Sequence, residues 1–414
     1  MPKNWNSYKL GEVAKLRKEG IKPSDFNGEN YIGLEHIGQE NFLLDGIGKA
    51  SDVTSNKSKF VEGDILYGKI RPYFKKVYRP KFSGICSTDI LIINTKNKDL
   101  ISQDYLHQLI KTQEFTDKAT ETSTGTKMPR ADWDSLKKWE IYFPPLPEQQ
   151  AIASILSAID DKIENNLAIN KTLEDMAMAL YKHWFVDFGP FQDGEFVDSE
   201  LGPIPKGWEV KRLDEICERI YSGGTPKTRE PNYWNGEVPW LSSGETRNKF
   251  VIETDKYITE LGLKSSSARM AYKGNTVIAS AGQGKTRGQT SYLFLDTSIN
   301  QSVIVLKADE NRIHKETLFV DLSLRYDEFR MISDSYSTRG SLTTKLIGGQ
   351  IKLALPDIEF QKKFNNQIRD MYNQIHSNLK EIQTLTQLRD TLLPKLISGE
   401  VRLKEFREQV ETVL

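Results

Sequence analysis

The sequence predicts a mixed α/β protein with two tandem globular units, each followed by a long helix, and the two helices are expected to pair as an antiparallel coiled coil. Three observations lead to this fold class. The chain is duplicated, each half mixes strand-like and helical patterns, and each half ends in apolar residues at helical spacing. The motif Pro-Lys-Asn-Trp at 2–5 returns at 205–208 as Pro-Lys-Gly-Trp, and the segment 143–150 has its counterpart at 354–361. A repeat of about 211 residues is far longer than a solenoid or propeller unit, so a whole module is duplicated.

Length and composition are those of an ordinary globular protein. At 414 residues the chain suits two or three domains, and its 38% hydrophobic and 28% charged content is typical of soluble proteins. No run of 18 apolar residues occurs, and the N-terminal segment lacks the apolar stretch of a signal peptide, so we expect a cytoplasmic protein without a membrane partner. Cys86 and Cys217 lie far apart in the sequence, which indicates neither a disulfide framework nor a metal site.

Charge is balanced along the chain, with 57 basic and 57 acidic residues and no strongly basic segment. A net charge of zero argues against a nucleic-acid surface that spreads over a whole domain. Any contact with nucleic acid must therefore come from local loops, and the balanced total favours large protein interfaces elsewhere in the molecule.

Two long segments carry the pattern of a coiled coil. Apolar residues alternate at spacings of four and three over several heptads, which favours a coiled coil over two amphipathic helices that each pack on their own domain. The predicted contact residues are Ile152, Leu156, Ile159, Ile163 and Asn166 in the first helix, and Ile368, Met371, Ile375, Asn378 and Leu385 in the second. Pro147 and Asp357 suit the helix starts, and Gly189 and Gly399 suit the ends. About 40 residues at 1.5 Å each make a rod of roughly 60 Å.

Chain order predicts how the two helices pair. If the first helix carries the chain from one globular unit to the next, the second must return along it to bury its apolar residues, so the pair is antiparallel. Asn166 and Asn378 occupy equivalent positions in the repeat, and a buried Asn typically fixes register at some cost in stability. We therefore hypothesise that these two asparagines set the register of the helix pair.

The globular units are expected to contain short strands at 64–69, 89–94, 275–280 and 302–306, and helices near 105–115 and 315–329. Two loops in each unit match in position. The candidate DNA-binding residues of the first unit are Lys69, Arg71, Tyr73, Lys75 and Lys76 in one loop, and Thr124, Thr126, Lys127 and Arg130 in the next. Those of the second unit are Ser280, Gln283, Lys285, Thr286 and Arg287, followed by Thr338, Arg339, Ser341 and Lys345.

The composition of these loops points to DNA. Glycine permits close backbone approach, Ser and Thr hydroxyls donate to phosphate oxygens, and Arg, Lys and Gln reach base edges in the major groove. Solvated loops without a ligand are the simpler alternative for any one loop. The same mixture at matching places in both units favours DNA reading.

One stretch resembles a nucleotide-binding loop. Residues 279–286 fit a relaxed phosphate-loop pattern that includes Lys285, which leaves a nucleotide-driven enzyme as an alternative function. Such a loop must open a helix whose N-terminal amides hold the phosphate, but residues 287–293 read as another strand. Other enzyme motifs are lacking, and the histidines are scattered at His36, His107, His183, His314 and His376. No catalytic residue is therefore predicted.

Four groups of motifs, in order and partly duplicated, identify a family. They are Gly-Thr at 125–126 with the Pro-rich segment 144–150, the aromatic segment 181–188, Ser-Gly-Gly-Thr-Pro at 222–226 with Pro-Trp at 239–240, and Leu-Leu-Pro-Lys-Leu-Ile-Ser-Gly-Glu at 392–400. With these motifs the chain resembles, over nearly its whole length, the specificity subunit of Type I restriction-modification systems.

The resemblance implies target recognition domains at 1–145 and 188–357, each reading one half of a bipartite double-stranded DNA site. It also implies conserved helical regions at 146–187 and 358–400, which dock two methyltransferase subunits, and leaves 401–414 as a C-terminal tail. Such a subunit has no catalysis, metal or cofactor of its own. S-adenosylmethionine, ATP and Mg are then expected on partner methyltransferase and restriction subunits. The alternative is a stand-alone duplicated DNA-binding or scaffold protein without a methyltransferase partner.

Overall fold

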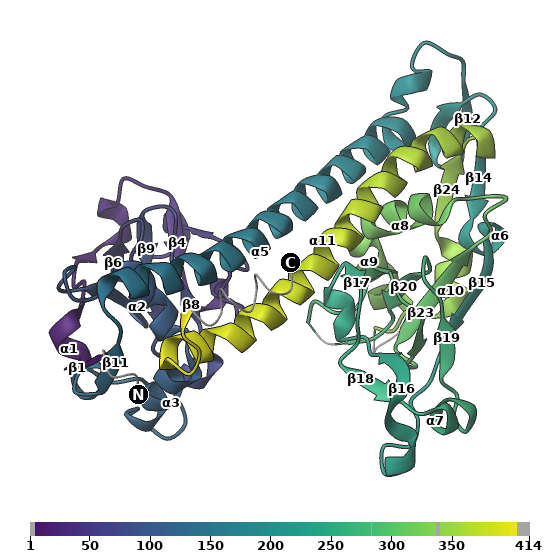
Figure 1. The fold of residues 1–414 in the computed structure, drawn as a ribbon. Coiled ribbons are helices and arrows are strands. Elements are labelled where there is room, and N and C mark those ends of the chain that lie inside the picture. The colour runs from purple at the N-terminus through teal and green to yellow at the C-terminus, as the bar shows by residue number, and fades with distance from the viewer. Residues whose placement is uncertain (1–4, 283, 337–339, 404–414) are drawn as a thin grey trace. The chain divides into compact units, whose positions relative to one another are not determined.

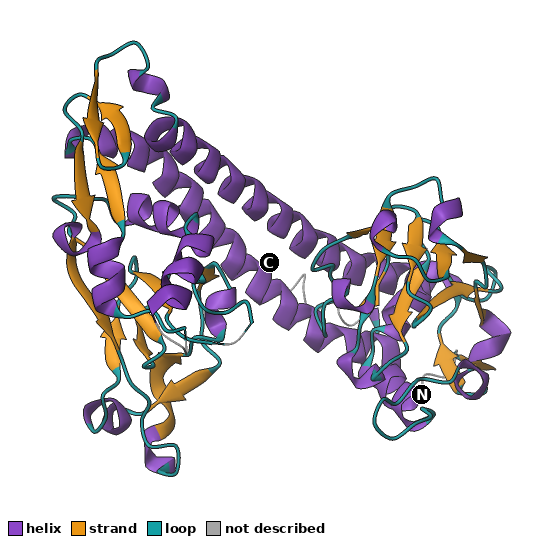
Figure 2. Ribbon diagram, turned by 180° about the vertical axis from the view of Figure 1, so that it is seen from behind, coloured by secondary structure: helices purple, strands orange, loops and turns teal. Residues whose placement is uncertain are grey.

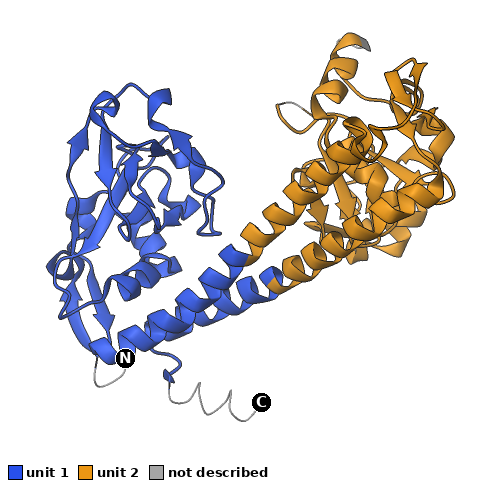
Figure 3. Cartoon of the chain, turned by 90° about the horizontal axis from the view of Figure 1, so that it is seen from above, with its two compact units in different colours: residues 1–165, 382–414 blue, residues 166–381 orange. Residues whose placement is uncertain are grey.

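The computed structural model describes residues 5–282, 284–336 and 340–403. It contains two compact units, one of residues 1–165 with 382–414 and one of residues 166–381 (Figure 3). The long helices α5 (Leu146–Tyr181) and α11 (Ile358–Ser398) each contribute to both units (Figure 1). The predicted fold class, mixed α/β with two long helices packed together, is confirmed. The finer domain boundaries stay a prediction, because the compact units divide inside the helices.

Each unit combines one four-stranded and one five-stranded sheet with short helices and at least one additional two-stranded sheet (Figure 2). In the first unit, one sheet has the order β2 (Ala14–Leu16), β10 (Ile90–Thr95), β7 (Ile65–Gly68), β8 (Val77–Tyr78), and the other has the order β3 (Gly20–Ile21), β6 (Lys57–Phe60), β9 (Gly84–Cys86), β4 (Asn30–Ile32), β5 (Gly48–Lys49). Its helices within the described residues are α1 (Leu10–Val13), α2 (Gln103–Ile110), α3 (Gln113–Glu121) and α4 (Trp133–Leu136).

The second unit repeats this arrangement. One sheet has the order β15 (Cys217–Ser222), β23 (Val303–Ala308), β20 (Thr276–Ala279), β21 (Thr290–Leu293), β17 (Phe250–Val251), and the other has the order β18 (Lys256–Ile258), β16 (Trp234–Leu241), β22 (Thr297–Ile299), β19 (Arg269–Ala271). Its described helices are α6 (Leu213–Ile216), α7 (Glu260–Lys264), α8 (Lys315–Ser323), α9 (Tyr326–Tyr336) and α10 (Thr344–Gln350). The hairpin of β12 (Phe196–Ser199) and β13 (Gly202–Pro205) precedes them.

The duplication is visible in the strand pairing. Strand β1 (Asn6–Lys9) runs antiparallel to β11 (Glu140–Phe143), and β14 (Glu209–Arg212) runs antiparallel to β24 (Lys352–Leu355). Strands β1 and β14 each lead into a four-residue helix, and strands β11 and β24 each precede a long helix. In each unit, a strand near the start of the repeat pairs with the strand at its end, as expected for an independent module.

The predicted helices near 105–115 and 315–329 are wrong in extent, because each is two helices. In the first unit α2 ends before Thr112, whose hydroxyl accepts a hydrogen bond from Phe115 N over 3.2 Å. Threonine is a good N-cap and starts a new helix at this point. The second unit shows the same break between α8 and α9.

A buried glutamine anchors the start of each long helix. Gln149 is fully buried, and its amide nitrogen donates to the carbonyls of Leu100 and Pro144 over 2.8 Å each. Gln361 does the same to Arg312 and Pro356 over 3.0 Å each. Side-chain amides that satisfy two buried carbonyls fix how the helix leaves the globular unit.

Replacing this anchor should destabilise the first unit. Gln149→Leu removes the donor for two carbonyls and the acceptor for Ser102 N, so we expect a loss of about 2 kcal/mol in the free energy of unfolding, measured by urea denaturation. The exposed neighbour Gln150 provides the control, since Gln150→Leu breaks none of these bonds. Equal losses for the two variants would contradict the anchor.

The two long helices pair in antiparallel fashion. In the second unit Asn166 donates to Glu381 and Asn378 donates to Asn170, both over 2.8 Å, so rising numbers on α5 meet falling numbers on α11. The three asparagines are 4% exposed or less. Asn378 thus bonds Asn170 instead of its repeat equivalent Asn166, and the role of these residues in register stays a prediction.

Most predicted contact residues of the helices are buried. Ile152, Leu156, Ile159, Ile163, Ile368 and Ile375 are at most 9% exposed, whereas Met371 and Leu385 are partly exposed. Some of them also belong to the core of a globular unit, since Ile368 and Ile375 pack in one cluster with Trp208 and Leu213. The helices are therefore held by each other and by the sheets beside them. Among the described residues, no helix combines the length and apolar character needed to cross a membrane.

Candidate nucleic-acid interface

In the first unit, the two predicted loops meet. The first follows β7 and the second follows α3, and hydrogen bonds join their backbones: Ala131 N donates to Lys69 O over 2.8 Å, and Arg71 N donates to Pro129 O over 2.7 Å. Ile70 also bridges to Arg130. Two segments that lie about 50 residues apart in sequence thus form one surface.

The second unit joins its loops at the same place. Leu342 N donates to Ser280 O over 2.8 Å, at the position of the bond between Ala131 and Lys69. The guanidinium of Arg287 adds hydrogen bonds to Gly340 O and to the Asp334 carboxylate. The structure therefore brings together the described parts of both predicted loop pairs.

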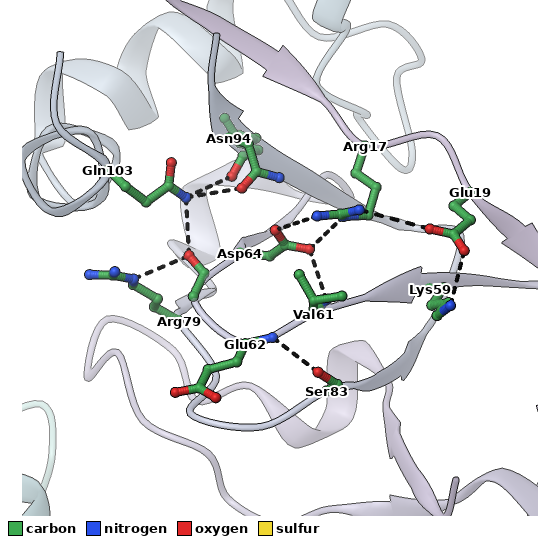
Figure 4. Close-up of polar contacts among 12 residues, drawn as sticks. Arg17, Glu19, Lys59, Val61, Glu62, Asp64, Arg79, Ser83, Asn94 and Gln103 are labelled. Atoms are coloured by element: carbon green, nitrogen blue, oxygen red, sulfur yellow. Dashed lines mark hydrogen bonds and ion pairs between the residues drawn. The ribbon is translucent and has the colours of Figure 1, made fainter. Parts of the chain in front are cut away.

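A polar network braces the strand that carries the first loop (Figure 4). Asp64 lies directly before β7 and pairs with Arg17 of the loop after β2, with 2.7 Å between Nε and the carboxylate. Asp64 also accepts from Val61 N over 2.9 Å, and Gln103 of α2 donates to Gly63 O over 3.0 Å. These bonds fix the N-terminal end of β7, and the loop follows its C-terminal end. The strand that carries the loop is therefore held in place by polar contacts.

Several predicted residues of the first unit are exposed as a DNA contact requires. Arg71, Tyr73, Thr124, Thr126, Lys127 and Arg130 are exposed. Arg71 has a left-handed backbone with φ of 49°, and its guanidinium lies 5.8 Å from the centre of the Phe74 ring. Such stacking holds the planar donor group out from the loop.

Two predicted lysines of this loop point inward. Lys76 Nζ donates to the carbonyls of Leu34 and Ile37 over 2.6 and 2.5 Å, which occupies its donors inside the unit. Lys75 Nζ lies 5.7 Å from the centre of the Phe42 ring. Burial lowers the pKa of both amino groups. These contacts disfavour Lys76 as a DNA contact and commit Lys75 partly to the interior, and both assignments stay predictions.

The second unit divides its predicted residues in the same way. Lys285 and Lys345 are exposed, Thr286 and Ser341 are half-buried, and Ser280 and Arg287 are buried. Gln283, Thr338 and Arg339 lie outside the described residues. Arg287 is a predicted DNA contact, and its role at the DNA stays a prediction. Its guanidinium is bound to Gly340 O and to the Asp334 carboxylate, which favours a role in holding the two loops together over the reading of a base.

The glycine-rich stretch of the second unit does not form a nucleotide site. After Lys285 the chain enters strand β21, whereas a phosphate loop needs a helix there. Two residues of α9 bind the backbone of this stretch: Tyr326 OH donates to Lys285 O over 3.0 Å, and Arg330 donates to Gly284 O over 2.6 Å. The loop is thus fastened to a helix that the sequence reasoning did not connect with it.

Three residues at the interface were missed from the sequence. The Asp89 carboxylate lies 3.4 Å from Lys69 Nζ and 3.9 Å from Arg130 Nε. Tyr326 and Arg330 fix the second unit's glycine-rich loop at its residues 284 and 285. Asp89 is recognisable only as a polar residue next to a strand. The sequence gives no indication of the roles of Tyr326 and Arg330, because their spacing along the chain does not reveal which loop helix α9 packs against.

Comparison with known proteins places both units in one family of domains. A family model described as the Type I restriction modification DNA specificity domain matches residues 2–175 and 205–387. The Type I restriction enzyme MjaIX specificity subunit of Methanocaldococcus jannaschii is 30% identical, over 98% of this chain and 95% of that protein. The HindI specificity subunit of Haemophilus influenzae is 24% identical, over 96% of this chain and 100% of that protein.

A solved structure has a similar fold. The crystal structure of a Type I restriction-modification system S subunit from M. genitalium matches with a TM-score of 0.62 and 20% sequence identity, over 95% of this chain and 96% of that one. At this identity the likeness concerns the fold alone.

Proposed function

Because the chain belongs to the Type I restriction-modification DNA specificity family, in which it is a specificity subunit, we propose that each of its units reads one half of a bipartite double-stranded DNA target. The observation that carries this proposal is the junction of two loops that occurs in each unit. Two backbone hydrogen bonds are common to both junctions: Ala131 N to Lys69 O corresponds to Leu342 N to Ser280 O, and Lys69 N to Asp89 O corresponds to Ser280 N to Ser302 O, while the side chains differ. Two loop junctions with a similar backbone and different side chains suit the recognition of two different half-sites. Linking the two readers makes their affinities combine.

The same family membership supports a set of partners. We infer that the chain is a DNA-recognition component without catalysis of its own, in the cytoplasm, and that two methyltransferase subunits dock on α5 and α11. S-adenosylmethionine, ATP and Mg then belong to methyltransferase and restriction subunits. The exposed polar faces of the helices, beside buried contact residues such as Ile163 and Ile375, leave room for such docking.

Selection from random double-stranded DNA by the full-length chain tests this function. We expect the bound sequences to contain two short specific blocks at a constant distance. A single contiguous block, or no selected sequence, would overturn the proposal. Co-purification with an adenine methyltransferase subunit distinguishes it from a stand-alone DNA-binding or scaffold protein, which would be isolated without one.

Exposed lysines of the loops should provide phosphate contacts. Lys127→Ala and Lys285→Ala each remove one exposed cation, so we expect weaker binding of all sequences alike. The slope of log K against log salt is negative, and it should become shallower by about 0.9 for each variant. Lys76→Ala is the matched control, because its amino group is bound to two carbonyls and its loss should leave the slope unchanged. A reduced slope for Lys76→Ala alone would reverse our assignment.

A further inference from the structure

In the first unit, three charged side chains from separate segments meet where the loops join. Lys69 N donates to Asp89 O over 3.0 Å, and the Asp89 carboxylate lies 3.4 Å from Lys69 Nζ and 3.9 Å from Arg130 Nε. The side chains of Lys69, Asp89 and Arg130 are 25%, 32% and 52% exposed, so part of each side chain is accessible to a ligand. Lys69 Nζ also donates to Thr88 O over 2.7 Å, which leaves further N–H donors on its ammonium group. We call these three residues the junction triad.

The second unit carries three serines on the same backbone. Ser280, Ser302 and Ser341 stand at the positions of Lys69, Asp89 and Arg130. Ser280 N donates to Ser302 O over 2.8 Å, and Leu342 N, next to Ser341, donates to Ser280 O over 2.8 Å. The two units thus keep the backbone of the junction and exchange its side chains. Residues that held the fold would be kept, so this exchange points to positions that determine which sequence is read.

The chemistry of the junction triad limits what it can recognise. A carboxylate on a DNA-facing surface is repelled by phosphates unless cations or a specific donor compensate it. Lys69 and Arg130 supply part of this compensation. A carboxylate only accepts hydrogen bonds, and cytosine N4 is its usual donor in the major groove, whereas Arg and Lys donate to guanine O6 and N7. A G·C pair presents this donor and these acceptors side by side.

We propose that Lys69, Asp89 and Arg130 together read one G·C base pair of the first half-site. Asp89 accepts from cytosine N4, and the two cations donate to guanine while they orient the carboxylate. This inference rests on the proposed function, because it requires the joined loops of the first unit to face DNA. It adds Asp89 to the residues that determine specificity.

The test replaces the carboxylate with the residue that the other unit already carries. Asp89→Ser keeps a backbone that the second unit shows to be compatible with serine. In selection from random DNA by the full-length chain, we expect the preference for G·C at one position of the first block to fall roughly tenfold, with the other positions unchanged. Asp89→Asn should instead move that preference towards A·T, since Asn pairs with adenine.

The control is Asp104→Ser in the same unit, which removes an exposed carboxylate paired with Arg79 at the start of α2. It should leave every position unchanged. A wild-type chain that selects two blocks, with Asp89→Ser and Asp89→Asn selecting the same sequence as wild type, would overturn the inference alone. A wild-type chain that selects no bipartite sequence would overturn the proposed function. Loss at all positions of the first block would show that Asp89 only holds the loops, and would also overturn the inference.

Discussion

Asp160→Asn is expected to lower the free energy of unfolding of the first unit by about 3–5 kcal/mol, the cost of leaving buried charges without their partner. Asp160 of α5 pairs with Lys111, whose side chain is fully buried, and lies 3.7 Å from Arg389 of α11, whose side chain is 3% exposed. Both cations also face the Phe42 ring, with 4.6 and 4.8 Å to its centre. Without the carboxylate, the buried ammonium of Lys111 loses its ion-pair partner and stays beside Arg389, which keeps its pair with Asp390 over 2.9 Å.

Urea unfolding of the full chain, followed by hydrogen exchange within residues 5–165, measures this effect. Asp161→Asn is the matched control, because its carboxylate is 64% exposed and pairs with the equally open Lys81, so we expect less than about 1 kcal/mol. Lys111→Met added to Asp160→Asn should recover much of the loss, since an apolar side chain then replaces the unpaired cation. A double variant no more stable than Asp160→Asn would contradict the explanation.

Arg287→Ala is expected to weaken recognition at several base pairs of the second half-site at once. A base-reading arginine would affect one position by about 1–3 kcal/mol. Arg287 instead binds Gly340 O of the other loop and the Asp334 carboxylate of α9, so its loss loosens the contact between the two loops, although the bond between Leu342 N and Ser280 O remains. Arg287→Lys should fail as well, because one ammonium does not reproduce the two-sided contact of a guanidinium. Relaxation at a single position would restore the base-reading role.

Patterns that repeat locally were predictable from the sequence. The duplication, the two long helices and the two loops in each unit follow from the residue spacing and from the Gly and Pro positions in the sequence. That the two loops of a unit meet was not predicted, and the structure shows it for the described parts of both loop pairs. The break between α2 and α3 was missed, because a threonine can also lie inside a helix. Only the structure shows that the Thr112 hydroxyl accepts from Phe115 N and so caps a new helix.

The direction of individual side chains was not predictable. Arg71 and Lys76 lie in one basic loop, yet one is exposed and the other is bound to Leu34 and Ile37, because left-handed backbone at Arg71 and Lys75 turns the chain between them. Arg389 occupies a heptad position where an apolar residue is usual, and its partner Asp160 is 229 positions away in sequence. Such pairs depend on how the helices are placed against the sheets.

The central claim is that the chain contains two independent readers of DNA, one in each unit. Selection from random DNA by wild type, Arg71→Ala and Arg287→Ala tests it most directly. We expect two blocks for wild type, a change in only one block for Arg71→Ala, and a change in only the other block for Arg287→Ala. If either substitution altered both blocks, or if both altered the same block, the division of recognition between the two units would be wrong.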